Sequence, residues 1–150
     1  MLLDALLQLS NAQAVTTTAV STNTIDLSQN RDLGPGENLH AIISVDTTAT
    51  AAGAATVTFQ IISSASAALT SPTVLSQTDA IPIANLTAGR KPIVIDLSPA
   101  VLNAQPIGQR YLGLQYTIGT GPLTAGAFTA YLSNSEVTVN ANYPSGFTVY

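Results

Sequence analysis

The segment Thr56-Val57-Thr58-Phe59-Gln60-Ile61 decides the fold, because apolar and polar side chains alternate along its whole length. Successive side chains of a β-strand point to opposite faces, so Val57, Phe59 and Ile61 share one face while the threonines and Gln60 share the other. A strand with one apolar and one polar face is typical of an antiparallel sheet that covers a core on one side and meets water on the other.

The same period of two recurs from residue 15 onward, in segments rich in β-branched residues. It predicts strands at about 15–27, 39–46, 56–63, 81–85, 92–97, 110–118 and 127–139. Turn signals separate them, among them Gly34-Pro35-Gly36, Ser71-Pro72, Ala88-Gly89 and Ser98-Pro99. Short strands divided by such turns predict an all-β fold, an antiparallel β-sandwich of jelly-roll or Greek-key type.

The N-terminal residues follow a different pattern. Leu2, Leu3, Leu6 and Leu7 recur at helical spacing, but so short a helix without a cap is marginal in water. We therefore expect residues 1–14 to form an N-terminal arm or short helix that is ordered by docking, on its own domain or on a neighbour. Residues 15–150 are predicted to be a single β-sandwich domain, because the chain is of ordinary domain length and shows no linker or repeat.

Charge is scarce throughout the chain. Only 8% of its 150 residues are charged, against about 25% in average soluble domains. Thr and Ser together make up 33 residues, and the stretches 47–78 and 111–135 hold no charge at all. Small uncharged polar side chains lose little entropy when they are covered, so this composition favours dense, permanent packing against other proteins over catalysis or the steering of charged ligands.

Composition also argues against several classes of partner. With a net charge of −4 and four cationic side chains, the chain has no basic stripe for phosphates, so we expect no nucleic-acid partner. No apolar run is long enough to span a membrane, and we expect no membrane partner. The absence of Cys excludes disulfides and thiolate metal sites. The N-terminal segment has no basic n-region and is interrupted by Asp4, so we do not expect it to act as an export signal.

One histidine, His40, is the single candidate general base. It lies on the strand face opposite Leu39, Ala41 and Ile43, and no nucleophile motif accompanies it, so an exposed strand histidine is the expected role. Gly119-Thr120-Gly121 resembles the start of a phosphate-binding loop, but predicted strands flank it and no helix follows, so we predict a hairpin turn there.

The carboxylates give no stronger signal for chemistry. Asp26, Asp96 and Glu136 alternate away from core residues on their predicted strands, which favours solvation over a paired-carboxylate site. Asp32 and Glu37 flank a turn and are the best, though weak, candidates for binding calcium, since no Asp-x-Asp loop signature is present. We therefore predict that the chain is not an enzyme and has no catalytic residue, metal ligand or cofactor.

Sugar binding remains an alternative function. Trp is absent, but Tyr111, Tyr131, Tyr143 and Tyr150 could stack on a ligand. Tyr111 and Tyr131 alternate with core leucines on their strands and are predicted to be exposed. Exposed tyrosines suit a glycan site and a protein interface equally well. A carbohydrate-binding or adhesin-like β-sandwich module thus remains open.

Three stretches carry a resemblance. LLQLSNAQAVTTTAVSTNTIDL (6–27), TVTFQIISS (56–64) and RYLGLQYTIGTGPLTAGAFTAYL (110–132) resemble the capsid cement, or decoration, proteins of short-tailed bacteriophages, which have a jelly-roll subunit. The resemblance covers nearly the whole chain. It implies a structural protein on the outer capsid surface of the virion, made in the host cytoplasm, that binds and stabilises the major capsid protein and also associates with itself, as a dimer.

The resemblance carries no catalytic motif, and the contact residues are our own prediction. The candidates for a capsid interface or self-interface are the apolar and aromatic residues of the two termini and the two strand tyrosines: Leu2, Leu3, Leu6, Leu7, Tyr111, Tyr131, Tyr143, Phe147 and Tyr150. The alternative for each terminus is that it closes the core of its own subunit.

Overall fold

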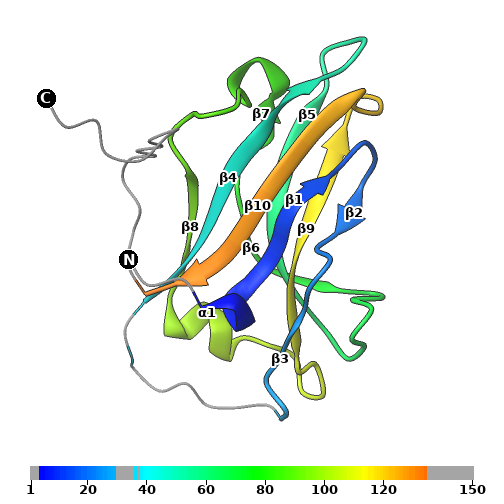
Figure 1. Ribbon diagram of the computed structural model, residues 1–150. Helices are drawn as coiled ribbons and strands as arrows, with labels where there is room; N and C mark the ends of the chain where they lie inside the picture. Colours follow the sequence, from blue (N-terminus) through cyan, green and yellow to red (C-terminus); the bar gives the residue numbers. More distant parts are fainter. Residues whose placement is uncertain (1–3, 30–35, 37, 135–150) are drawn as a thin grey trace, which may run out of the picture.

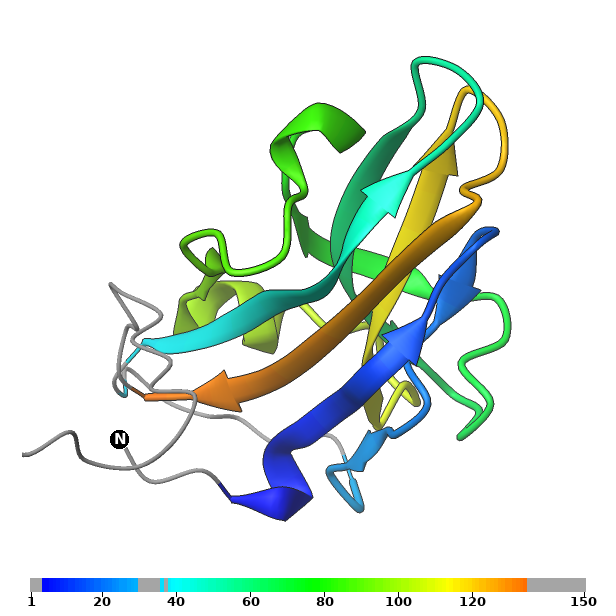
Figure 2. The same ribbon diagram turned by 45° about the horizontal axis from the view of Figure 1, so that its top comes forward.

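The structure, a computed structural model, describes residues 4–29, 36 and 38–134, and these form two antiparallel sheets packed face to face (Figures 1 and 2). Sheet A has the strand order β1-β10-β4-β8, and sheet B the order β2-β9-β5-β6, with β3 paired to β9 and β7 to β5. The bounds are β1 (Gln8–Ala14), β2 (Ala19–Val20), β3 (Ile25–Asp26), β4 (Leu39–Thr50), β5 (Thr56–Ser64), β6 (Thr73–Gln77), β7 (Ile81–Pro82), β8 (Ile93–Leu97), β9 (Tyr111–Gly119) and β10 (Ala125–Ser133). The predicted all-β antiparallel sandwich is confirmed.

Helices are short and lie at the ends of the sandwich. They are η1 (Ala5–Leu7), η2 (Ile83–Asn85) and α1 (Pro99–Asn103). The α1 turn begins with an N-cap, Ser98, whose side chain accepts a hydrogen bond from the Val101 amide, and Pro99 occupies the first turn. No helix in the described ranges has the length and apolar character needed to cross a membrane.

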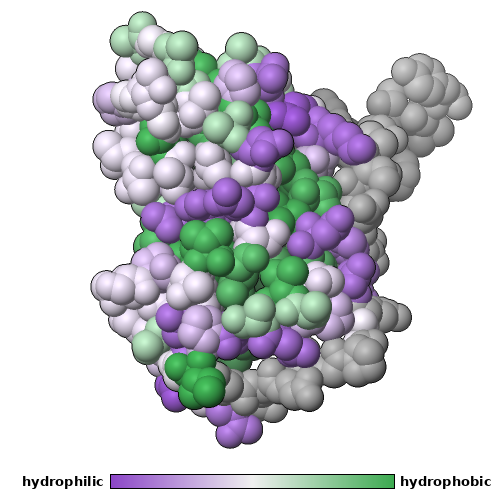
Figure 3. Space-filling model, turned by 180° about the vertical axis from the view of Figure 1, so that it is seen from behind, coloured by the Kyte–Doolittle hydropathy of each residue, from purple (hydrophilic) through white to green (hydrophobic). Residues whose placement is uncertain are grey.

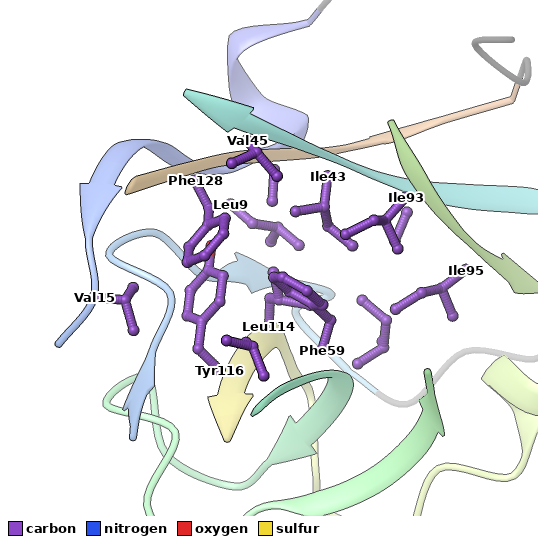
Figure 4. Close-up of a cluster of buried hydrophobic side chains, with 14 of the residues drawn as sticks. Leu9, Val15, Ile43, Val45, Phe59, Ile93, Ile95, Leu114, Tyr116 and Phe128 are labelled. Atoms are coloured by element: carbon purple, nitrogen blue, oxygen red, sulfur yellow. The ribbon is translucent and has the colours of Figure 1, made fainter. Parts of the chain in front are cut away.

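Aromatic side chains from both sheets meet in the core between them. Phe59 of β5, Tyr116 of β9 and Phe128 of β10 are all fully buried (Figure 4). Phe59 contacts both other rings edge to face, with centroids 5.8 Å from Tyr116 and 5.2 Å from Phe128, while Tyr116 and Phe128 stack at 5.5 Å. Such pairs add about 0.5–1.5 kcal/mol each to the burial of their surface. Val57 and Ile61 flank Phe59 in this core, so the predicted apolar face of β5 is confirmed.

The predicted N-terminal arm is corrected over residues 8–14, which form β1 at the edge of sheet A. Leu9 of this strand is 1% exposed in the core, and its backbone pairs with β10. Helical spacing of the leucines is not decisive, because a neighbouring strand satisfies the backbone groups that an isolated short helix leaves exposed. Within residues 4–14 the helical turn is limited to Ala5–Leu7, and the Asp4 carboxylate caps it by accepting a hydrogen bond from the Leu6 amide at 2.9 Å.

Several strand boundaries also differ from the prediction. The segment 15–27 holds two short strands, because the Ser21 hydroxyl accepts a hydrogen bond from the Leu114 amide at 3.0 Å and so interrupts the backbone ladder to β9. The predicted strand 81–85 is β7 followed by η2, and β6 at 73–77 was not predicted. In the predicted strand 127–139, β10 ends at Ser133, and residues 135–139 lie outside the described ranges.

Candidate functional site

The charged side chains of the sandwich are divided unequally between its two sheets. In sheet A, His40 and Asp46 of β4 and Asp96 of β8 alternate with core residues and therefore lie on the outer face. Four strands of sheet B, namely β2, β9, β5 and β6, bear no charged side chain, and Asp26 of β3 is the one charged residue on the described strands of this sheet. Over these four strands the outer face of sheet B therefore carries no charge.

A row of three glutamines crosses this face. Gln60 on β5 lies directly opposite Gln115 of β9 on one side and Gln77 of β6 on the other, and we call Gln115, Gln60 and Gln77 the glutamine row. The Thr117 hydroxyl donates to Gln60 Oε1 at 2.6 Å, and Gln60 Nε2 donates to Gln77 Oε1 at 2.6 Å. The central amide is therefore held at both ends. Gln60 and Gln115 are half-buried, and Gln77 is exposed.

An apolar patch adjoins the glutamine row on the same face. Leu69, in the loop between β5 and β6, is buried over Gly113 of β9, whose cross-strand partner is the buried Ile62. A Cβ at position 113 would lie 2.2 Å from Leu69 Cδ1, so a larger residue would require the buried Leu69 side chain to move. Nearby Val74 of β6, paired with Ile62, is 43% exposed. Figure 3, which views this side of the molecule, shows a hydrophobic patch bordered by hydrophilic atoms.

An ionic cluster lies at the end of sheet B, where β3 pairs with β9. Arg110 Nε lies 3.1 Å from Asp26 Oδ1, its Nη2 donates to the Tyr111 hydroxyl at 2.7 Å, and its guanidinium lies 4.9 Å from the Tyr111 ring centroid. The hydrogen bond with Tyr111 and, after it, the charge of Asp26 raise the pKa of Arg110. Because Arg110 and Asp26 neutralise each other, the cluster adds no net charge beside the uncharged face.

The candidate base His40 has found a carboxylate partner. Its Nδ1 lies 2.9 Å from Asp96 Oδ1, and the two residues are cross-strand neighbours on the outer face of sheet A. On its other side His40 lies opposite Ser133 of β10. Ser133, His40 and Asp96 are thus neighbours across three strands and are the residue types of a hydrolase triad. However, triad chemistry also needs free N–H donors for an oxyanion, and here the surrounding backbone amides belong to the ladders that join β10, β4 and β8. His40 and Asp96 form a cross-strand hydrogen bond on the outer face of sheet A.

The other candidate groups for chemistry do not converge. No group of three His, Cys, Asp or Glu side chains suited to a metal is present in residues 4–29, 36 and 38–134. Asp32, Glu37 and Glu136 lie outside the described ranges. Gly119-Thr120-Gly121 lies where β9 leads to β10, with left-handed φ values of 60° at Thr120 and 95° at Gly121. Because β9 belongs to sheet B and β10 to sheet A, this segment connects the two sheets, and the predicted hairpin turn is wrong.

The predicted contact residues have different environments. Leu6 is 82% exposed, whereas Leu7 is partly buried against the core. Tyr111 is half-buried beside Arg110. The residues Leu2, Leu3, Tyr143, Phe147 and Tyr150 lie outside the described ranges, so the predictions made for them remain predictions.

The prediction that Tyr131 is exposed is wrong, because only 9% of the residue is accessible. Tyr131 lies on β10, a central strand of sheet A, between Gln8 of β1 and Ile42 of β4. Ile42 points to the same outer side and is fully buried as well. Burial raises the pKa of the Tyr131 hydroxyl.

The glutamine row was missed by sequence reasoning. The alternation along β5 places Gln60 on the polar face, and that signal was available. Which residues of β6 and β9 lie beside it depends on strand order and register, and a single sequence does not specify either.

Comparison with known families gives one match. Residues 9–132 match the sequence model of the family described as Bbp16. The matched region runs from β1 into β10 and so includes both sheets and the glutamine row. A search of curated proteins finds no match.

Proposed function

The chain belongs to the Bbp16 family, a name that suggests a phage-related protein, and from this membership we propose that it is a structural virion protein. In this proposal it binds the outside of an icosahedral phage capsid and cements neighbouring subunits of the major capsid protein. The observation that supports it most is the outer face of sheet B, which has no charged side chain in its four main strands although the sandwich is otherwise acidic.

A cement protein needs lasting contact and no chemistry. Each copy can act through modest contacts, because a subunit that holds two shell proteins at once makes its second contact at a high effective concentration. Self-association, proposed here as a dimer, would multiply the contacts further. A sandwich that is held by packing, without disulfides, is suited to a particle that meets varied redox conditions.

The two strand tyrosines give less support to the alternative function, a sugar-binding module. Tyr131 is too buried to offer a stacking surface, and the Tyr111 ring is already engaged by the Arg110 guanidinium. We therefore retain the capsid as the proposed partner and place the protein on the outer surface of the virion.

The proposal is tested with particles of the encoding phage that are prepared with and without this protein. Complete particles are expected to retain their DNA at higher temperature and lower ionic strength than particles lacking the protein, and purified protein added back is expected to co-sediment and restore that resistance. An unrelated acidic protein of similar mass serves as the control. Equal resistance of both kinds of particle, with no co-sedimentation, would contradict the proposal.

A further inference from the structure

We propose that the outer face of sheet B, centred on the glutamine row, is the surface that meets the capsid shell, and that the shell surface it meets is itself uncharged. This inference rests on the proposed function and specifies which of the two sheet faces acts and what chemistry its partner presents. It leads to a property that can be measured directly: binding that changes little with ionic strength.

The first step concerns desolvation. A charged side chain that is covered by a partner must find a counter-charge or lose its hydration without compensation. Contact through sheet A would cover Asp46 and Asp96, which lie on its outer face. Contact through sheet B covers no charged group of β2, β5, β6 or β9. An acidic chain can therefore bind without this cost through these four strands of sheet B, in a contact that leaves the Asp26–Arg110 pair at the end of the sheet uncovered.

The second step concerns the order of the polar groups. A glutamine side chain normally loses much rotamer freedom when a partner fixes it. Here the Thr117 hydroxyl and the Gln77 amide already hold Gln60 through two bonds of 2.6 Å, so this part of the ordering precedes binding. Interfaces that are ordered beforehand bind more tightly for the same contact area.

The third step concerns what the row offers to a partner. In the described part of the chain no hydrogen bond of the Gln115 side chain is found, and the Gln77 nitrogen is likewise available. An amide presents both donor and acceptor groups. Backbone amides and the side chains of Asn, Gln, Ser and Thr complement such a row, whereas a charged group placed over it would find no opposite charge.

The fourth step concerns the apolar part of the contact. Protein interfaces combine an apolar centre with polar groups and are depleted of charge at that centre. Val74, which is exposed and paired with the buried Ile62, supplies apolar surface next to the glutamine row. The face thus holds both components of a protein interface and lacks the charges that interface centres exclude.

The experiment compares the same chemical change on the two faces. Gln60→Glu and Gln77→Glu each place a carboxylate on sheet B, and Gln77, being exposed, tolerates the change with little effect on folding. Gln8→Glu is the matched control, because Gln8 is half-buried like Gln60 but lies beside Tyr131 on the outer face of sheet A. Circular dichroism establishes that each variant is folded, and co-sedimentation with shells lacking the protein gives the Kd.

We expect the unmodified protein to bind with nearly the same Kd at about 0.1 M and about 1 M NaCl, although the screening length falls from about 10 Å to about 3 Å. Gln60→Glu and Gln77→Glu should weaken binding at least about tenfold, or about 1.4 kcal/mol, and Gln8→Glu should not. Weakening by Gln8→Glu alone, or a Kd that rises steeply with salt, would overturn the inference and leave the proposed function standing. Failure of the unmodified protein to bind shells would refute the proposed function instead.

Discussion

The buried hydrogen bond between Ser10 and Tyr116 offers a direct test of how the N-terminal strand is held. Ser10 lies on β1 of sheet A and Tyr116 on β9 of sheet B, and both residues are fully buried. Tyr116→Phe removes the hydroxyl with almost no change in the shape of the core and leaves Ser10 Oγ without this partner. An unsatisfied buried polar group costs about 1–3 kcal/mol, so we expect a loss of that size in the free energy of unfolding.

The second arm of the test separates the hydrogen bond from the packing. Ser10→Ala leaves the Tyr116 hydroxyl unpaired in the core and should cost about 1–3 kcal/mol as well. When both partners are removed, no polar group is left unsatisfied, so the double variant should lose clearly less than the sum of the single losses. Urea unfolding, followed by circular dichroism, provides the three values.

Tyr131→Phe is the matched control for this cycle. Tyr131 is also buried but has no side-chain hydrogen bond in the described part of the chain, so removal of its hydroxyl should change stability less than Tyr116→Phe does. If the losses of Ser10→Ala and Tyr116→Phe simply add in the double variant, the two groups are not coupled, and the account of β1 as a strand fixed by this bond is refuted.

Three further predictions follow from individual contacts. Burial raises the pKa of Tyr116 to about 12 from an ordinary 10.0, so its contribution to stability should be fully present below pH 10 and fall by roughly 3 kcal/mol as the pH rises through 12. Unfolding midpoints should show this loss in the parent and not in Tyr116→Phe. Gly113→Ala, whose Cβ would lie 2.2 Å from Leu69, should lower the free energy of unfolding by about 1–3 kcal/mol, whereas Gly53→Ala, with open space around it, should leave the melting temperature nearly unchanged. Asp96→Asn breaks the exposed His40 pair and should change stability by less than about 1 kcal/mol in a denaturant titration; a larger loss would show that the pair is structural.

The sequence predicts which residues of the central strands enter the core, because apolar and polar residues alternate within the sequence of each strand. Val57, Phe59 and Ile61 lie inside as the period of two requires, and His40 lies on the opposite face from Ala41. These assignments need only the local geometry of one strand. They do not depend on which strand lies beside it.

The sequence-based predictions are wrong where the structure or burial of a residue depends on the strand that lies beside it. Tyr131 alternates correctly to the outer side of sheet A, yet a central strand between Gln8 and Ile42 leaves little of its ring accessible. β1 escapes detection because its sequence lacks regular alternation, and its pairing with β10 shifts register twice, with Ala12 at a φ of 43°. In both cases tertiary pairing overrides the local pattern.

Strand pairing also brings charge-free segments of the sequence together on one face of the sandwich, the outer face of sheet B. The charge-free stretch 47–78 contains β5 and β6, and the charge-free stretch 111–135 contains β9 as well as β10 of sheet A. These strands are far apart in the sequence, yet β5 pairs with β9 in unbroken register from Thr56↔Gly119 to Ser64↔Tyr111. If the scarcity of charge served only to fill the core, both outer faces would remain free to carry charge. Sheet A carries Asp46 and Asp96 on its outer face, whereas β2, β9, β5 and β6 of sheet B carry no charge. The scarcity of charge is therefore greatest on the outer surface of sheet B, as the proposed partner surface requires.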